Sequence, residues 1–381
     1  MGILRRLNLA KLLQKKSFFL LGPRSTGKST LIHQQLAGQA TLIDLLEGDH
    51  YLRLSTRPQE LEALARAEPR HPIVVIDEIQ KIPELLDEVH RLIEKFKIRF
   101  LLTGSSARKL KGDRANLLAG RAWMAHLFPL SWCEIKKFGL DRYLRWGGLP
   151  QVYLGQDPAE ELRAYTRTYL YEEIKAEAMV RKIPAFARFL EVAALSNGQL
   201  LNFTEVASDC AVPASTVREY YAILEDTLMG FLLPPWTASK KRKAIQTAKF
   251  YFFDIGVSLS LAKIQQLDRH SNLYGNTFEH FIGMELRAYL SYTRKPDELR
   301  FWRSVNDQEV DFVVGDHTAI EVKSTPRVSP KDLTGLKTLA EEKKFQDFLL
   351  VSQDPLATTR EGVRCLPWET FLEKLWGGEL F

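Results

Sequence analysis

The residues best suited to chemistry near the start of the chain form a short loop that contains glycine. Gly22, Gly27, Lys28 and Ser29 satisfy the spacing G-x-x-x-x-G-K-[ST], which is typical of loops that bind nucleotide phosphates. Glycines let backbone N–H groups point at a polyphosphate, the lysine neutralises its charge, and the serine hydroxyl holds Mg²⁺. We therefore expect ATP and Mg²⁺ to bind the whole loop, Gly22, Pro23, Arg24, Ser25, Thr26, Gly27, Lys28, Ser29 and Thr30.

Two neighbouring acids supply the next piece of chemistry. Asp77 and Glu78 end the β-branched run 72–76, which predicts a buried parallel strand. Parallel strands present such side chains at their carboxyl ends, where ligands bind. We expect Asp77 to hold Mg²⁺, directly or through water, and Glu78 to polarise the attacking water.

A second group of chemically capable residues lies near the other end of the chain. Residues 309–314 and 318–323 predict two strands joined by a turn at 315–317. Strand alternation places Asp311 on one face, and Glu321 and Lys323 side by side on the face opposite the core. Asp311 and Glu321 are then placed to share a divalent cation, with Lys323 stabilising charge that develops at phosphorus.

The elements that position these residues require more than one domain. The chain has 381 residues, a net charge of +6 and an ordinary apolar fraction of 45%, so it is long enough for three modules. The modest positive charge favours anionic partners, although it also serves solubility. Three cysteines without metal-ligand spacing, and no apolar run of membrane-spanning length, predict a cytoplasmic protein with no membrane partner.

The middle of the chain is predicted to be mostly helical. Residues 160–193 carry apolar side chains at helical spacing and predict a lid, and 203–210 with 212–221 match a helix-turn-helix. Residues 232–254 would form a wing whose tip is basic and suited to phosphate contacts. A solvated charged loop and a protein-docking surface are the alternatives. The tip residues are Lys240, Lys241, Arg242 and Lys243.

The first module resembles the AAA+ ATPases. The resemblance rests on the phosphate loop, on 77–80, on Thr103-Gly104-Ser105-Ser106 after a strand at 98–102, and on Gly120-Arg121 before a strand at 122–128. It implies that Thr103 or Ser105 senses the γ-phosphate. It also implies that Arg121, with Arg114 in reserve, reaches into the site of a neighbouring subunit. A second sensor arginine of the family kind is not evident.

The C-terminal strands resemble the PD-(D/E)xK nuclease fold. The resemblance rests on the paired strands that carry Asp311 and Glu321-Val322-Lys323, with Glu279 upstream on a predicted helix. It implies catalytic roles for Glu279, Asp311, Glu321 and Lys323. Folds of this kind can also persist as binding modules that keep their acids.

Taken whole, the chain resembles a family of prokaryotic AAA+ ATPases with a C-terminal nuclease-like domain. The expected α/β fold comprises an AAA+ P-loop parallel sheet at 1–150, a helical lid and winged-helix region at 151–265, and a PD-(D/E)xK nuclease-like domain at 266–381. The resemblance implies a motor that hydrolyses ATP and acts on duplex or branched DNA as a homo-oligomer such as a hexameric ring. Its C-terminal domain would grip or cleave the DNA. The alternative is a regulatory nucleotide-dependent switch whose two later modules only bind partners.

Overall fold

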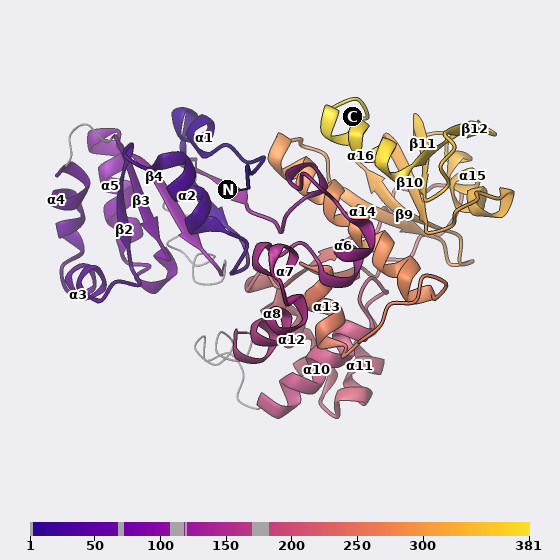
Figure 1. Ribbon diagram of the computed structural model, residues 1–381, viewed down its shortest axis with the longest axis horizontal. Coiled ribbons are helices and arrows are strands. Elements are labelled where there is room, and N and C mark those ends of the chain that lie inside the picture. The colour runs from indigo at the N-terminus through magenta and orange to yellow at the C-terminus, as the bar shows by residue number, and fades with distance from the viewer. Residues whose placement is uncertain (1–2, 68–71, 107–117, 119, 170–182) are drawn as a thin grey trace. The chain divides into compact units, whose positions relative to one another are not determined.

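The computed structural model describes the chain except for residues 1–2, 68–71, 107–117, 119 and 170–182 (Figure 1). Its internal contacts divide the chain into two compact units. The first comprises residues 1–130 with 226–229, and the second comprises 131–225 with 230–381.

The first unit is built on a five-stranded sheet in the order β2-β3-β4-β1-β5, and every neighbouring pair is parallel. The strands are mostly buried apolar runs, as expected for a parallel sheet covered by helices. This confirms the predicted α/β module with a parallel sheet. The strands are β1 (Ser17–Leu21), β2 (Ala40–Asp44), β3 (Ile73–Asp77), β4 (Arg99–Gly104) and β5 (Ala122–His126).

Helices cover this sheet and close its core. In α5 the buried positions Leu85, Leu86, Val89, Leu92 and Ile93 recur at helical spacing and join the core under β3 and β4. The helices of this unit are α1 (Leu9–Lys15), α2 (Lys28–Leu36), α3 (Gly48–Thr56), α4 (Leu61–Arg66) and α5 (Leu85–Phe96).

The second unit begins with helices and a two-stranded hairpin. The helices expected at 203–210 and 212–221 are present as α11 and α12, and Asn202 caps α11 by accepting a hydrogen bond from the Glu205 N–H. Part of the expected lid at 160–193 lies outside the described residues. The elements are α6 (Leu140–Trp146), α7 (Pro150–Leu154), α8 (Pro158–Ala164), a π-helical turn (Tyr165–Tyr169), α10 (Ile183–Leu195), α11 (Phe203–Cys210), α12 (Ala214–Asp226), β6 (Gly230–Leu233), β7 (Lys249–Phe252) and α13 (Ile255–Leu261).

The segment that joins β6 to β7 differs from a projecting wing tip. Pro235 and Ala244 form bridges to Phe301 and Ser304, so the segment runs along the edge of the C-terminal sheet. The backbone N–H groups of Lys240 and Lys241 donate to the Glu342 carboxylate. The lysine side chains at 240, 241 and 243 are nevertheless exposed.

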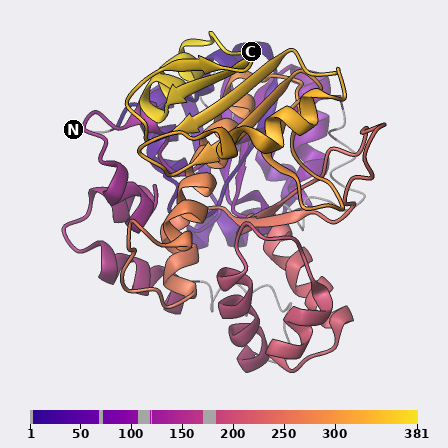
Figure 2. The same cartoon turned by 90° about the vertical axis from the view of Figure 1, so that its right-hand side faces the viewer.

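The rest of the second unit is a six-stranded mixed sheet in the order β12-β13-β11-β10-β9-β8 (Figure 2). Strands β8, β9 and β10 are antiparallel neighbours, and β11 pairs parallel with β10 after a helical crossover. The strands predicted at 309–314 and 318–323 are confirmed. The elements are α14 (Asn272–Thr293), β8 (Leu299–Arg303), β9 (Glu309–Val314), β10 (Thr318–Lys323), α15 (Thr334–Ala340), β11 (Asp347–Ser352), β12 (Thr358–Arg360), β13 (Val363–Pro367) and α16 (Trp368–Gly377).

Candidate functional site

The phosphate loop curls tightly between β1 and α2. Gly27 and Ser25 both adopt positive φ angles, of 92° and 57°. Gly22 has no room for a side chain, because a Cβ there would lie 2.5 Å from the carbonyl oxygen of Leu127. Helix α2 begins at Lys28, so its first N–H groups open toward the loop, where they suit an anion.

Lys28 places a buried positive charge inside the curl of the loop. Its side chain is 6% exposed, and Nζ donates to the carbonyl oxygens of Gly22 at 2.7 Å and Pro23 at 3.2 Å. These carbonyls are neutral acceptors. A nucleotide phosphate offers a charged acceptor and a stronger hydrogen bond to the same ammonium.

Three predicted residues from separate segments meet at the carboxyl edge of the sheet. The Ser29 hydroxyl donates to Asp77 Oδ2 at 2.9 Å, and the Thr103 hydroxyl donates to the other oxygen of the same carboxylate. Thr103 Oγ1 also accepts the Glu78 N–H at 3.0 Å. A hydroxyl beside a carboxylate is the oxygen donor set that Mg²⁺ prefers, so Ser29 and Asp77 fit the ion that the loop implies.

Glu78 stands at the end of β3 in a strained backbone conformation, with φ at 60°. Its Oε2 accepts hydrogen bonds from Gln80 Nε2 and, at 3.4 Å, from the Ser105 hydroxyl. Thr103 therefore contacts Asp77, whereas Ser105 contacts Glu78. Gln80 was not predicted as a site residue, and the sequence signal for it is its place in the motif Asp77-Glu78-Ile79-Gln80.

Arg5 supports the phosphate loop from the N-terminal segment, and the sequence did not predict this role. Its guanidinium is buried and donates to the carbonyl oxygens of Thr26 at 2.7 Å and Phe128 at 2.6 Å. These bonds tie the loop to the segment that follows β5. The sequence shows only a basic residue before a helix, which carries no signal for such a contact.

Arg121 lies at the amino ends of the strands, and the phosphate loop lies at their carboxyl ends. Arg121 precedes β5, whose first residue Ala122 pairs with Ser17 at the start of β1, whereas the loop follows Leu21 at the end of β1. Its Nε donates to Glu94. The arginine therefore does not join the phosphate loop of its own chain. Arg114 lies outside the described residues.

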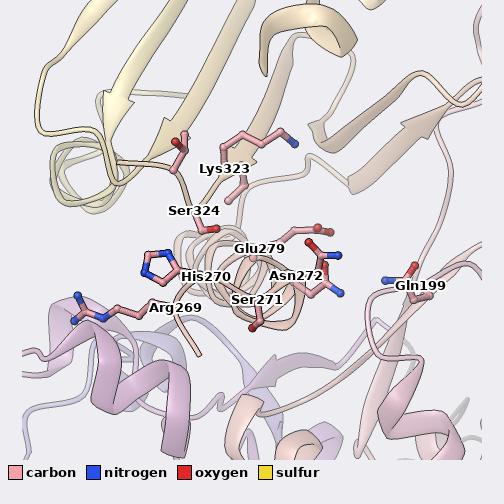
Figure 3. A pocket seen from close by; sticks show the side chains of 12 residues that line it. Gln199, Arg269, His270, Ser271, Asn272, Glu279, Lys323 and Ser324 are labelled. Carbon is pink, nitrogen blue, oxygen red and sulfur yellow. The ribbon is translucent and has the colours of Figure 1, made fainter. Parts of the chain in front are cut away.

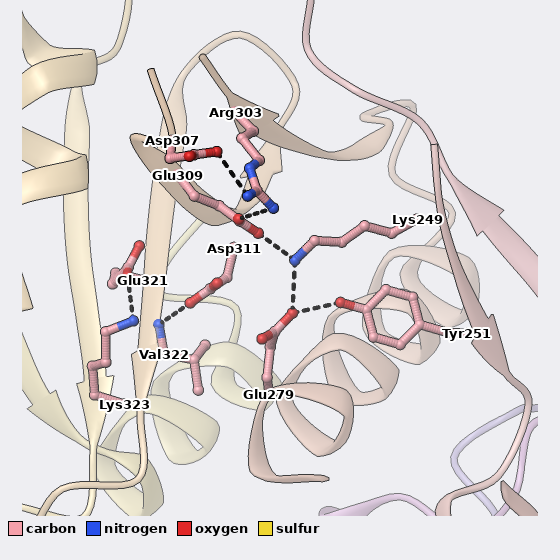
Figure 4. Close-up of polar contacts among 10 residues, drawn as sticks. All are labelled: Lys249, Tyr251, Glu279, Arg303, Asp307, Glu309, Asp311, Glu321, Val322 and Lys323. Carbon is pink, nitrogen blue, oxygen red and sulfur yellow. Dashed lines mark hydrogen bonds and ion pairs between the residues drawn. The ribbon is translucent and has the colours of Figure 1, made fainter. Parts of the chain in front are cut away.

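The second candidate site forms where β9 and β10 lie side by side (Figure 4). Asp311 Oδ2 accepts the Val322 N–H at 2.8 Å, and Lys323 Nζ pairs with Glu321 Oε1 at 2.5 Å. Within the part of the chain that the structure describes, Glu321 Oε2 is buried without a partner. The structure thus brings together Asp311, Glu321 and Lys323, as predicted from strand alternation.

Burial controls the charges of this cluster. It raises the pKa of Asp311, with further repulsion from Glu279, and raises the pKa of Glu321 well above its usual value, with further repulsion from Asp311. Burial alone would lower the pKa of Lys323, but Asp311 and Glu321 outweigh it and raise that pKa. The two acids therefore favour a shared proton or a cation, and the unpartnered Glu321 oxygen fits a metal ion.

Glu279 lies on α14 and its charge acts on Asp311, but it also pairs with residues of β7. Its Oε1 accepts from the Tyr251 hydroxyl at 2.5 Å and pairs with Lys249 Nζ at 3.1 Å. Among the described residues, no group of three or more His, Cys, Asp or Glu side chains is placed to hold a metal ion. A lysine and a tyrosine from β7 thus engage Oε1 of Glu279, while Asp311 and Glu321 remain the pair that was predicted to share a divalent cation.

A cavity of about 660 Å³ opens beside these residues (Figure 3). Glu279 and Lys323 lie on its wall, together with the start of α14 and with Gln199 from the segment before α11. Its polar lining suits a charged ligand more than an apolar one. The cationic and amide side chains on the wall are Arg269, Lys323, Gln199, Asn272 and Asn276.

The sheet and the phosphate loop define an AAA-type domain, and residues 14–136 match the family model described as AAA domain. This confirms the predicted class of the first module. Residues 137–268 and 274–371 match two domains of unknown function, DUF8612 and DUF4143. The nuclease-like and winged-helix assignments therefore stay predictions.

The chain is 30% identical over 325 residues to the uncharacterized protein Rv2008c of Mycobacterium tuberculosis, and equally to Mb2031c of Mycobacterium bovis. The match covers 81% of this chain and 71% of each relative, so the chain belongs to the same family as these mycobacterial proteins. An uncharacterized protein of Haemophilus influenzae is 25% identical over 260 residues, which cover 63% of this chain and 62% of that protein.

Similar solved structures include the ORC1 protein of Aeropyrum pernix in complex with DNA. The match has 12% identity and a TM-score of 0.25, and it covers 68% of this chain and 90% of that chain. The replication initiator DnaA bound to AMPPCP and single-stranded DNA matches at 11% identity with a TM-score of 0.32, and the match covers 59% of this chain and 90% of that chain. TM-scores this low carry no argument about function. Among the described helices, none has the length and apolar character needed to span a membrane.

Proposed function

We propose that the first unit binds ATP with Mg²⁺ and hydrolyses it. The observation that carries this proposal is the contact of Ser29 and Thr103 with one carboxylate, Asp77, beside the loop that holds Lys28. Lys28 and the first N–H groups of α2 bind the phosphates, and Ser29 with Asp77 would hold the ion. When bound, Mg²⁺ supplies positive charge at the phosphate oxygens.

Glu78 is the residue we assign to the attacking water. Its carboxylate stands one residue beyond Asp77 and is held by Gln80 and Ser105, so its direction is fixed by side-chain contacts. A carboxylate held in this way can orient a water molecule and accept its proton. Either Thr103 or Ser105 would sense the γ-phosphate, because the hydroxyl of each donates to the carboxylate of one of the two acids.

We further propose that the protein acts on duplex or branched DNA as a homo-oligomer. Helices α10, α11 and α12 followed by the β6–β7 hairpin support a winged-helix region. Leu200 forms an isolated antiparallel β-bridge with Lys249, which extends the hairpin toward a third strand. The lysines at 240, 241 and 243 expose charge for phosphate contacts. Arg121, at the sheet edge away from its own phosphate loop, supports action on a neighbouring subunit.

The C-terminal domain would grip or cut the DNA. The cavity that contains Lys323, Arg269 and Asn272 has the side chains needed to bind a phosphodiester. The order α14, β8, β9, β10, α15, β11, with acids on β9 and β10, supports the nuclease-like assignment. Cleavage would depend on Asp311 and Glu321, because the two acids lie together and Glu321 has a buried oxygen left for a metal ion.

A second candidate function, a regulatory nucleotide-dependent switch, has its own support. The backbone of Lys240 and Lys241 is bound to Glu342, and Arg242 pairs with Glu341 at 3.0 Å, so part of the basic segment already engages the same chain. The deciding experiment is ATP turnover with linear, single-stranded and four-way-junction DNA. Stimulation by branched DNA favours the motor, and indifference to every nucleic acid favours the switch.

A further inference from the structure

Lys249 is a lysine held almost entirely away from solvent, with 4% of the residue exposed. It begins β7, and Tyr251 follows two residues later on the same face of the strand, because strand side chains alternate. Both side chains therefore reach Glu279 on α14 (Figure 4). Phe250 points elsewhere and packs against Tyr221 of α12.

Two carboxylates share the Lys249 ammonium. Nζ lies 3.1 Å from Glu279 Oε1 and 2.5 Å from Glu309 Oε1, and the Phe301 ring lies beside it with its centroid 5.4 Å from Nζ. Burial alone would lower the pKa of Lys249, but Glu279 and the other acidic groups around it raise that pKa well above its usual value. The lysine is thus a permanent buried cation, which is stable only while it is paired.

We propose that the Lys249 ammonium is the built-in cation of this pocket: it pairs with Glu279 and Glu309 and excludes a divalent metal ion from Glu279. The nuclease resemblance gives Glu279 a catalytic role beside the cation of Asp311 and Glu321. Here a side chain of the protein itself, Lys249, pairs with Glu279. Glu279 then lines the cavity without binding a metal ion. Asp311 and Glu321 remain the residues that would bind a divalent ion.

This inference deepens the nuclease-like part of the proposed function, and metal binding tests it separately from DNA binding or cleavage. Mn²⁺ binding to the full chain, without nucleotide, is measured by electron paramagnetic resonance. Glu279→Gln should bind Mn²⁺ as the wild type does, as should Glu373→Gln, a control at an exposed position on α16. Loss of about tenfold or more in Mn²⁺ affinity in Glu279→Gln alone would overturn the proposal, since even outer-shell partners of a metal contribute that much.

The complementary variant removes the built-in cation. Lys249→Met removes the ammonium that Glu279 and Glu309 share, while Glu309 keeps its ion pair with Arg303 at 3.2 Å, so the Glu279 carboxylate should gain one Mn²⁺ site per chain. Adding Glu279→Gln to Lys249→Met should remove that site again. Tb³⁺ in the new site should luminesce on excitation of Tyr251, and this signal should disappear when Tyr251→Phe is added.

A folded Lys249→Met chain that gains no Mn²⁺ site contradicts the proposal. Circular dichroism and thermal unfolding with and without Mn²⁺ show whether that variant folds. If it does not fold under either condition, the Glu279→Gln comparison in the folded chain decides the question by itself, because it keeps Lys249 in place.

Discussion

Ser29 and Asp77 lie 48 positions apart in the chain, yet the Ser29 hydroxyl donates a 2.9 Å hydrogen bond to the Asp77 carboxylate. The parallel sheet accounts for this contact, because β1 and β3 both end at the same edge. The fold itself therefore brings together the two oxygen groups that we propose as Mg²⁺ ligands.

Lys28 and Glu78 should fail in different ways. Lys28→Ala should abolish ATP binding, because the phosphates lose a buried positive charge, whereas Glu78→Gln should bind ATP and lose turnover by about 10²–10⁴-fold, the usual contribution of a general base. Calorimetric ATP titration and phosphate release separate the two effects. Lys11→Ala, at an exposed lysine of α1, is the control. Turnover of Glu78→Gln at the wild-type rate would show that another residue activates the water.

Arg121→Ala should bind ATP normally and hydrolyse it poorly. The reason is that Arg121 lies at the amino ends of the strands, away from its own phosphate loop, so its proposed target is the site of a neighbouring chain, which it would reach by leaving Glu94. Mixing this variant with Glu78→Gln should restore part of the activity, because some interfaces then combine an intact Arg121 with an intact Glu78. A monomer that hydrolyses ATP at full rate at high dilution would contradict this expectation.

The exposed lysines at 240, 241 and 243 should contribute to DNA affinity. Changing these three to glutamine should weaken binding to all sequences and make the salt dependence shallower by about 3 in logarithmic slope, close to 0.9 per phosphate contact. Arg242 is left unchanged because it pairs with Glu341. The matched control changes the exposed Lys137, Lys295 and Lys331, which lowers the net charge equally. An unchanged slope would assign the segment to protein docking.

Asp311→Asn should remove any metal-dependent cleavage while ATP turnover and most DNA affinity remain. Asparagine still accepts the Val322 N–H, so the strands stay in place, but the charge that attracts a metal ion is lost. Cleavage of linear, single-stranded and four-way-junction DNA with Mg²⁺ and Mn²⁺ is the measurement. An inactive wild type on all three substrates would assign the domain to gripping and leave the ATPase proposal intact.

The stability of the second unit should fall in mild acid because of His280. Burial lowers the pKa of this histidine to about 4, and its ring contacts the Phe252 carbonyl and Asn197. Since the folded pKa lies below the usual value, the unfolded chain takes up the proton first, and stability declines as the pH falls from about 6.5 to 4, by at most about 3 kcal/mol. Urea unfolding of wild type and His280→Gln across this range measures the difference, and the variant should lose this part of the pH dependence.

Local patterns in the sequence predicted the strands and loops that carry the acids. The runs at 72–76, 309–314 and 318–323 become strands because they are apolar or alternate, and each leaves Asp77, Asp311 or Glu321 at a defined position. The partners of these residues come from far along the chain and follow no local pattern. Lys249 is 30 positions from Glu279, and Arg5 is 123 positions from Phe128, so both contacts depend on tertiary packing.

The separation of Arg121 from the phosphate loop also limits the symmetry of the assembly. An interface that joins the amino edge of one sheet to the carboxyl edge of the next uses two different surfaces and is heterologous. A two-fold dimer would complete both of its sites only if Arg121 and the phosphate loop lay on one self-complementary surface. If the two surfaces are separate, the proposed assembly is a closed ring, and a rotation that fails to close would give a filament with one incomplete site at its end.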